Sequence, residues 1–284
     1  MKQKTIHNSI TLTGKGLHSG VNARLTLKPA NENTGIVFIR KDVNPEKMIK
    51  GVYYNVQNTM LTTALIEDGV EIKTIEHLYS ALAGLAVDNL IIEIEGPEIP
   101  IMDGSSTPFI FAIKSAGLKL QDANRKFVKI KKEIKVIEDD KIALLKPFDG
   151  TKATFEINYN NKLINATPQK AEFNSKTDSY LHTISRARTF GFEKDVEILK
   201  QKNCILGGSL ENAILVGENS ILNKEGLRIK DEFVKHKLLD AIGDLYLLNY
   251  QIIGEYYGFK SGHTLNNKLL RSLMGNSDAW EFVE

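Results

Sequence analysis

The chain contains HLYSALAG at residues 77–84 and HKLLDAIG at residues 236–243. In both stretches a histidine stands seven residues before a glycine, and apolar residues recur at helical spacing. Each is followed by a strand-like run, Leu90–Ile94 or Ile252–Tyr257, and then by a second helical pattern. A histidine and a glycine alone can match by chance, but the shared order of elements indicates an internal repeat. We therefore predict an α+β fold of two similar domains, each pairing a sheet with helices.

Alternation of polar and apolar residues predicts several half-buried strands. The runs are Ser9–Thr13, Ala23–Leu27, Asn89–Ile94, Phe127–Ile130 and Ile134–Ile137. The last two follow a helical segment and a polar stretch at Gln121–Arg125, so strands begin again at this point. We place a domain boundary near Asn124, which predicts a first domain of residues 1–124 and a second of residues 125–284.

Helical periodicity predicts four helices, and residues with known capping preferences mark their ends. We expect them at Ile75–Ala86 with Thr74 as N-cap, at Phe109–Ala116 ending at Gly117, at Glu232–Leu248, and at Asn266–Met274 ending at Gly275.

Composition excludes several classes of protein. With 37 basic and 35 acidic residues the net charge is +2, so nothing demands nucleic acid as a partner. Cys204 is the only cysteine, which excludes an intrachain disulfide and a cysteine-rich zinc module. The stretch Met1–Leu17 does not resemble a signal peptide, and no apolar run has transmembrane length. We expect a cytoplasmic protein without a membrane-spanning segment.

His236 has the most informative context of the six histidines. On a helix, residues four apart share a face, so His236 and Asp240 can point at one spot, and Asp244 extends the same stripe. A neutral imidazole and a carboxylate at this spacing suit a divalent metal ion, zinc above all. The alternative is a solvated helix face with an ordinary histidine–aspartate pair, and this segment alone favours that alternative.

Glu76 and His77 are further candidates for the same metal site. Neighbours on a helix point about 100° apart, so both cannot be equivalent metal ligands. If His77 binds a metal, Glu76 lies beside it, where a general base for the attacking water belongs. The alternative is a glutamate that only complements the helix dipole. His77, His236 and Asp240 would leave a fourth position open, as catalytic zinc sites do, at the interface between the two domains.

His263 follows YGFKSG at residues 257–262, which we expect to form a loop between a strand and a helix. From there it can approach a substrate from the side opposite Glu76. As an imidazolium it can protonate an amine leaving group or stabilise an oxyanion. The alternative is a loop histidine without a catalytic role.

Six motifs, in the same order and over almost the full chain, closely resemble those of the UDP-3-O-acyl-N-acetylglucosamine deacetylase family. They are KGLHSG at 15–20, TIEHL at 74–78, PEIPIMDGS at 97–105, ISRARTFG at 184–191, HKLLDAIGD at 236–244 and KSGH at 260–263. The resemblance implies two α+β domains, each a mainly antiparallel sheet packed with two helices, with the helices layered between the two sheets. It also implies zinc-dependent hydrolysis of the acetamide of a UDP-linked acylated amino sugar, an early committed step of lipid A biosynthesis.

The resemblance further implies roles for individual residues. The implied metal ligands are His77, His236 and Asp240, and the implied catalytic residues are Glu76 as the base, His263 as the acid, Asp244 as its assistant and Thr189 near the tetrahedral intermediate. A site of two histidines and one aspartate accepts Fe²⁺ as well as Zn²⁺, so the metal in the cell stays open.

The implied substrate contacts divide between an acyl chain and a nucleotide. The groove for the chain would lie in segment 190–215, along Phe190, Phe192, Val196, Ile205, Gly207, Gly208 and Ala213. Lys237 and Lys260 would contact the diphosphate, and Tyr159 would stack on uracil. Asn158 stands where the family has an aspartate. No nucleic acid and no obligatory protein partner is implied.

Two other functions stay open at this point. One is a zinc hydrolase of another amide or N-acetylated sugar, which predicts a short polar pocket rather than an apolar channel. The other is a non-catalytic RNA-binding module, which predicts a basic, aromatic sheet face and no metal. The near-neutral charge and the expected convergence of His77, His236 and Asp240 argue against the second.

Overall fold

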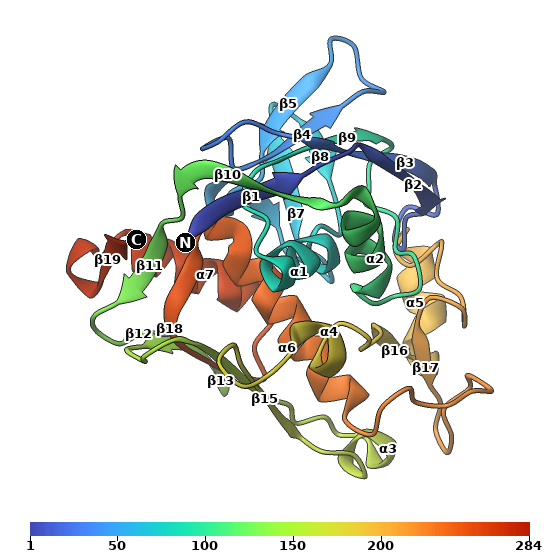
Figure 1. Cartoon of the computed structure of the whole chain (residues 1–284). Coiled ribbons are helices and arrows are strands. Elements are labelled where there is room, and N and C mark those ends of the chain that lie inside the picture. Colours follow the sequence, from blue (N-terminus) through green and yellow to red (C-terminus); the bar gives the residue numbers. More distant parts are fainter.

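The computed structural model describes all residues, 1–284, as two mixed sheets with helices between them (Figure 1). The first sheet has the order β2 (Ile10–Lys15), β3 (Asn22–Pro29), β9 (Leu90–Glu95), β4 (Ile36–Arg40) and β5 (Lys47–Lys50). The second contains β12 (Ile134–Glu138), β13 (Lys141–Lys146), β18 (Gln251–Phe259), β14 (Thr151–Glu156) and β15 (Lys170–Asn174). β11 (Phe127–Ile130) pairs with the first residues of β18, and β19 (Trp280–Val283) pairs with β11.

The two sheets share one connection pattern. In the first sheet, β9 is antiparallel to β3 and parallel to β4. In the second, β18 is antiparallel to β13 and parallel to β14. Each sheet is therefore two antiparallel hairpins joined by a later strand, and that strand follows the histidine-containing helix of the sequence repeat. The predicted α+β fold with mainly antiparallel sheets is confirmed, whereas the boundary near Asn124 stays a prediction.

Four helices lie between the sheets (Figure 1). They are α1 (Glu76–Leu85), α2 (Thr107–Ala116), α6 (Glu232–Leu245) and α7 (His263–Met274). Their apolar side chains join those of both sheets in a single core of 53 buried residues. None of the helices combines the length and the apolarity that crossing a bilayer requires.

Smaller elements surround this framework. A two-stranded sheet pairs β1 (Lys2–Ile6) with β10 (Leu118–Asn124), and a three-stranded sheet contains β6 (Val56–Asn58), β7 (Ala64–Glu67) and β8 (Val70–Ile72). Next to the groove segment, β16 (Phe190–Phe192) pairs with β17 (Ile214–Val216). The short helices are α3 (Lys162–Asn165), α4 (Tyr180–Thr183), α5 (Val196–Gln201) and the 3₁₀ turns η1 (Tyr53–Asn55), η2 (Glu193–Asp195), η3 (Tyr246–Leu248) and η4 (Ser277–Ala279).

The predicted strands and helices are all found, with four corrections at helix ends. α2 begins at Thr107, two residues before the expected start at Phe109. Thr74 is not the N-cap of α1, because its backbone has a φ of +58° and its hydroxyl donates to Glu98 instead. The long helix becomes 3₁₀ after Leu245. α7 begins at His263 rather than Asn266, because Gly262 is extended and its carbonyl oxygen accepts from the Asn266 N–H at 2.9 Å, closing the first turn. His263 is therefore a helical residue and not a loop residue.

The glycines of the sequence repeat allow close packing of backbone. A Cβ at Gly243 would lie 2.1 Å from the carbonyl oxygen of Glu76, so α6 approaches α1 more closely than any side chain permits. The hydroxyl of Ser80 on α1 donates to the carbonyl oxygen of Leu239 on α6 at 2.7 Å and reinforces the contact. At Gly84, a Cβ would lie 2.2 Å from the ring of Tyr180.

This packing predicts that Gly243→Ala destabilises the protein although alanine is the better helix former. Helix propensity alone predicts a gain of about 1 kcal/mol, whereas overlap with the backbone of Glu76 predicts a net loss of about 1–3 kcal/mol. Denaturant unfolding measures the difference. Gly191→Ala is the control, because a Cβ at Gly191 meets nothing within 4 Å. A Gly243→Ala protein at least as stable as wild type would contradict the close crossing.

Candidate metal centre and active site

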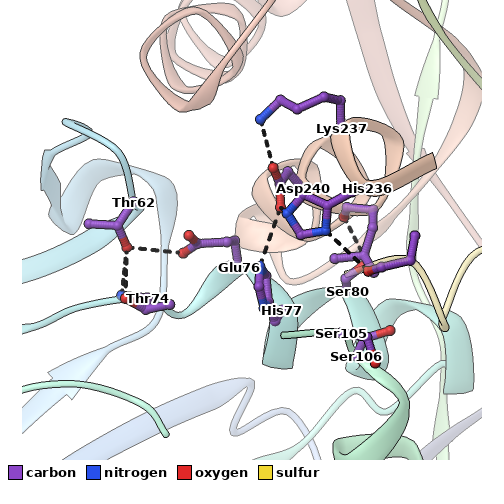
Figure 2. A network of polar contacts seen from close by, with 12 residues as sticks. Thr62, Thr74, Glu76, His77, Ser80, Ser105, Ser106, His236, Lys237 and Asp240 are labelled. Carbon is purple, nitrogen blue, oxygen red and sulfur yellow. Dashed lines mark hydrogen bonds and ion pairs between the residues drawn. The ribbon is translucent and has the colours of Figure 1, made fainter. Parts of the chain in front are cut away.

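His77, His236 and Asp240 come together where α1 crosses α6 (Figure 2). All three are buried, and one ligand atom of each lies within 4.8 Å of the other two. The Nε2 atoms of His77 and His236 lie 3.5 Å and 3.3 Å from Oδ1 of Asp240. That oxygen is buried and has no hydrogen-bond partner in the protein, which fits a cation between the three groups.

The ring of His236 is oriented from behind by a carbonyl group. Its Nδ1 lies 3.1 Å from the carbonyl oxygen of Ala187, and because a carbonyl only accepts, Nδ1 carries the proton. Nε2 is then left with a free lone pair toward Asp240. Burial lowers the pKa of His236 to about 3, so the ring is neutral near pH 7, the form that binds a metal. Two imidazoles and one carboxylate match the ligand set of catalytic zinc sites.

Asp240 is held as a carboxylate. Its Oδ2 accepts a hydrogen bond from the ammonium of Lys237 at 2.7 Å (Figure 2). Burial acts to raise the pKa of Asp240, but His236 and Lys237 outweigh burial and hold that pKa well below its usual range. The third ligand therefore carries a negative charge that a cation can neutralise.

Glu76 lies beside the ligands. Its Oε2 accepts from the backbone N–H of Thr63 at 3.1 Å and lies 3.4 Å from the hydroxyl of Thr62. Its Oε1 lies 3.8 Å from Nε2 of His263. Burial raises the pKa of Glu76 above its usual value, as a general base that works near neutral pH requires.

His263 approaches the site from the first turn of α7. Its Nδ1 lies 2.9 Å from Oδ2 of Asp244, which also accepts from the side-chain amide of Asn266 at 2.8 Å. Burial acts to lower the pKa of His263, but the contact with Asp244 prevails and raises that pKa to about 9. The ring is therefore an imidazolium at neutral pH and can donate a proton from Nε2.

The ligands, Glu76 and His263 line a cavity of about 540 Å³ that extends along the groove segment. Other predicted site residues that line it are Phe190, Phe192, Val196, Ile205, Gly208, Ala213, Thr189, Tyr159 and Lys237. The ring of Tyr159 packs against Phe190 and Phe192, with centroids 5.6 and 5.9 Å apart. An apolar extension beside polar, convergent groups suits a ligand with an alkyl chain.

Two residues of the expected binding set lie outside this cavity. The ammonium of Lys260 pairs with Asp140. Gly207 packs against another loop instead, since a Cβ there would lie 2.2 Å from the carbonyl oxygen of Gly16. The glycine at 207 therefore allows two backbone segments to meet, and its contact with a lipid tail stays a prediction.

Glu98 is a site residue that the sequence reasoning did not single out. It is fully buried and accepts from the backbone N–H groups of His18 at 2.9 Å and Ser19 at 2.7 Å, and from the Thr74 hydroxyl at 2.7 Å. His18 lines the cavity, so Glu98 fixes part of its wall. The sequence offered one signal of this role, a carboxylate inside the otherwise apolar PEIPIM run. A carboxylate that is buried with such a run needs hydrogen-bond donors from other segments.

A buried ion pair fixes the segment that carries Ala187 and Thr189. Arg188 and Glu232 are almost completely buried, and Nε of Arg188 donates to Oε1 of Glu232 at 2.8 Å. The backbone N–H of Arg188 donates to the same oxygen at 3.1 Å. The pair binds this segment to the first residue of α6 and so sets the position of the Ala187 carbonyl behind His236.

Comparisons with known proteins agree over the whole chain. Residues 3–275 match the family described as UDP-3-O-acyl N-acetylglycosamine deacetylase. A protein of Haemophilus influenzae (strain PittEE) named UDP-3-O-acyl-N-acetylglucosamine deacetylase is 51% identical over 284 residues, which cover 100% of this chain and 93% of that protein. The protein of the same name from Hahella chejuensis is 52% identical over 283 residues, covering 100% of this chain and 94% of that protein. The match spans every element that builds the site, and it shows that the chain belongs to the UDP-3-O-acyl-N-acetylglucosamine deacetylase family.

Proposed function

We propose that the chain removes the acetyl group of UDP-3-O-acyl-N-acetylglucosamine by zinc-dependent hydrolysis and releases acetate and UDP-3-O-acyl-glucosamine for lipid A biosynthesis. The observation that carries this proposal is the convergence of His77, His236 and Asp240 in the wall of a cavity with an apolar extension. The names of the relatives support the substrate. The cytoplasmic location and the lack of a protein partner stay predictions.

Zinc held by the two imidazoles and the carboxylate would polarise the amide carbonyl and make the attacking water more acidic. Glu76 is the proposed base. One of its oxygens is occupied by the N–H of Thr63, and Oε1 accepts no hydrogen bond from the protein, so Oε1 is free to take the proton of the water.

His263 is the proposed acid. An amine is a poor leaving group unless its nitrogen is protonated, and the imidazolium of His263 holds a proton on the side of the ring that faces Glu76. Asp244 keeps that ring charged and oriented. Thr189, half-buried in the cavity wall, is proposed to donate a hydrogen bond to the developing oxyanion.

The proposed substrate contacts follow the cavity. The acyl chain would lie along Phe192, Val196 and Gly208, and the uracil would stack on Tyr159. Lys237 lies in the cavity wall near the ligands. Lys260 remains a proposed contact of the diphosphate. To make this contact, its ammonium must leave Asp140 and pair with a phosphate oxygen instead.

Metal removal is the first test. Chelation is expected to abolish acetate release from UDP-3-O-acyl-N-acetylglucosamine, and about one equivalent of zinc is expected to restore it. Asp240→Ala should lower the affinity for zinc by roughly tenfold or more, measured by competition with a zinc-sensitive dye. His182→Ala, which changes an exposed histidine outside the cavity, should bind zinc like the wild type. Zinc-loaded wild type without turnover would refute the substrate, and normal zinc binding by Asp240→Ala would refute the metal site.

The pH dependence tests the acid. Because the pKa of His263 is raised to about 9, the acid form is present below that pH, and kcat should fall as the pH rises through about 9. Asp244→Asn removes the charge that raises this pKa, so the alkaline limb should move to lower pH. His263→Gln should lower kcat by roughly 10²–10⁴-fold and lose the limb. An unchanged alkaline limb in His263→Gln would assign it to another group.

The acyl chain separates the proposal from hydrolysis of other N-acetylated sugars. UDP-N-acetylglucosamine leaves the apolar extension empty, and each buried methylene contributes about 0.8 kcal/mol. Its kcat/KM should therefore be lower by roughly 100-fold or more than that of the 3-O-acyl substrate. Equal kcat/KM for the two substrates would favour a hydrolase of other N-acetylated sugars.

A further inference from the structure

The imidazole of His263 lies between two carboxylates. Asp244 Oδ2 is 2.9 Å from Nδ1, and Glu76 Oε1 is 3.8 Å from Nε2. The second oxygen of each carboxylate has the same partner. Oδ1 of Asp244 accepts from the hydroxyl of Thr63 at 2.6 Å, and Oε2 of Glu76 accepts from the backbone N–H of Thr63 at 3.1 Å. Thr63 thus occupies one oxygen of each carboxylate and leaves the other oxygen to His263.

Thr63 does not touch the space that a substrate would fill. Its exposed fraction is 1%, and it does not line the catalytic cavity, although Leu61 of the same segment does. Any effect of its hydroxyl on the reaction must therefore pass through Asp244.

The segment that carries Thr63 is fastened to the helix that carries His263. Arg271 on α7 donates to the carbonyl oxygen of Val56 at 3.0 Å, and Asn267 donates to that of Tyr53 at 2.9 Å. The hydroxyl of Thr59 lies 2.7 Å from the hydroxyl of Thr264, the neighbour of His263. These contacts connect the segment before Thr63 to α7, so the segment that carries Thr63 is held against the helix that carries the imidazole.

We infer that Thr63 is a positioning residue of the acid–base pair, which sets the orientations of Glu76 and Asp244 about His263 by donating to both carboxylates. The inference rests on the proposed function, because it takes Glu76 as the base and His263 as the acid. Without the hydroxyl, Asp244 loses its only donor to Oδ1, and the carboxylate is free to turn away from the ring. Loss of alignment by about 1 Å is sufficient to slow a reaction by roughly 100-fold.

A matched pair of substitutions separates the hydroxyl from the packing. Thr63→Val keeps the shape and removes the hydroxyl, and it should lower kcat by roughly 10- to 100-fold with KM within about twofold of wild type. Thr63→Ser keeps the hydroxyl and removes the methyl group, and it should recover kcat to within about threefold. Equal losses in both variants would show a packing role and overturn the inference, as would a Thr63→Val enzyme with the kcat of wild type.

A second readout does not depend on turnover or on metal. In metal-free protein, the proton between Nδ1 of His263 and Asp244 should give a slowly exchanging, low-field NMR signal in wild type and in Thr63→Ser. The signal should broaden or disappear in Thr63→Val, because Asp244 is no longer held from its far side. If wild type showed no deacetylase activity, the proposed function would fail while this signal still tested the contact. An unchanged signal in Thr63→Val would refute the positioning role.

Discussion

Where α1 crosses α6, the backbone of Gly243 lies against the carbonyl oxygen of Glu76, at a distance that no Cβ permits. His77 is the next residue of α1, and Asp240 lies one helical turn before Gly243 on α6. The contact that brings the two backbones together therefore also brings the ligand side chains into range of one another. The cluster that could hold a metal ion belongs to the contact between the two helices, and neither helix contains it alone.

Buried charge is costly unless it is paired or hydrogen-bonded, and this site concentrates it. Glu98 accepts from two backbone N–H groups and a hydroxyl. Glu232 is paired with Arg188, and Asp244 accepts from two side chains besides the imidazole that it orients. Two carboxylate oxygens of the site differ: Oδ1 of Asp240 is buried without a hydrogen-bond partner, and Oε1 of Glu76 has Nε2 of His263 no closer than 3.8 Å. Within the site, these oxygens lie where the proposed mechanism needs a cation and a water molecule.

The sequence predicted those parts of the site that depend on local spacing. His236 and Asp240 share a helix face because they are four residues apart, and their helix has the expected period. The contact of Thr63 with Asp244 could not be predicted, because the two residues are 181 positions apart in the sequence. An uncharged threonine also has no local pattern that indicates a role in a site. Thr74 was wrongly predicted as an N-cap for the same reason, since a distant carboxylate competes for its hydroxyl. Local patterns identify the groups that react, whereas long-range pairing decides how they are held.

The strand order of the two sheets has a consequence for how the chain can be assembled. β9 joins the hairpins β2–β3 and β4–β5, and β18 joins β12–β13 and β14–β15, yet each joining strand is synthesised after all four strands of the hairpins that it joins. Hairpins form from local contacts, but their union must await a strand that arrives later and closes a long loop. In both halves the helix that precedes the joining strand is the one that carries a histidine of the cluster. During synthesis, the two hairpins of each half can therefore be joined only after the helix that carries a histidine of the cluster has been made.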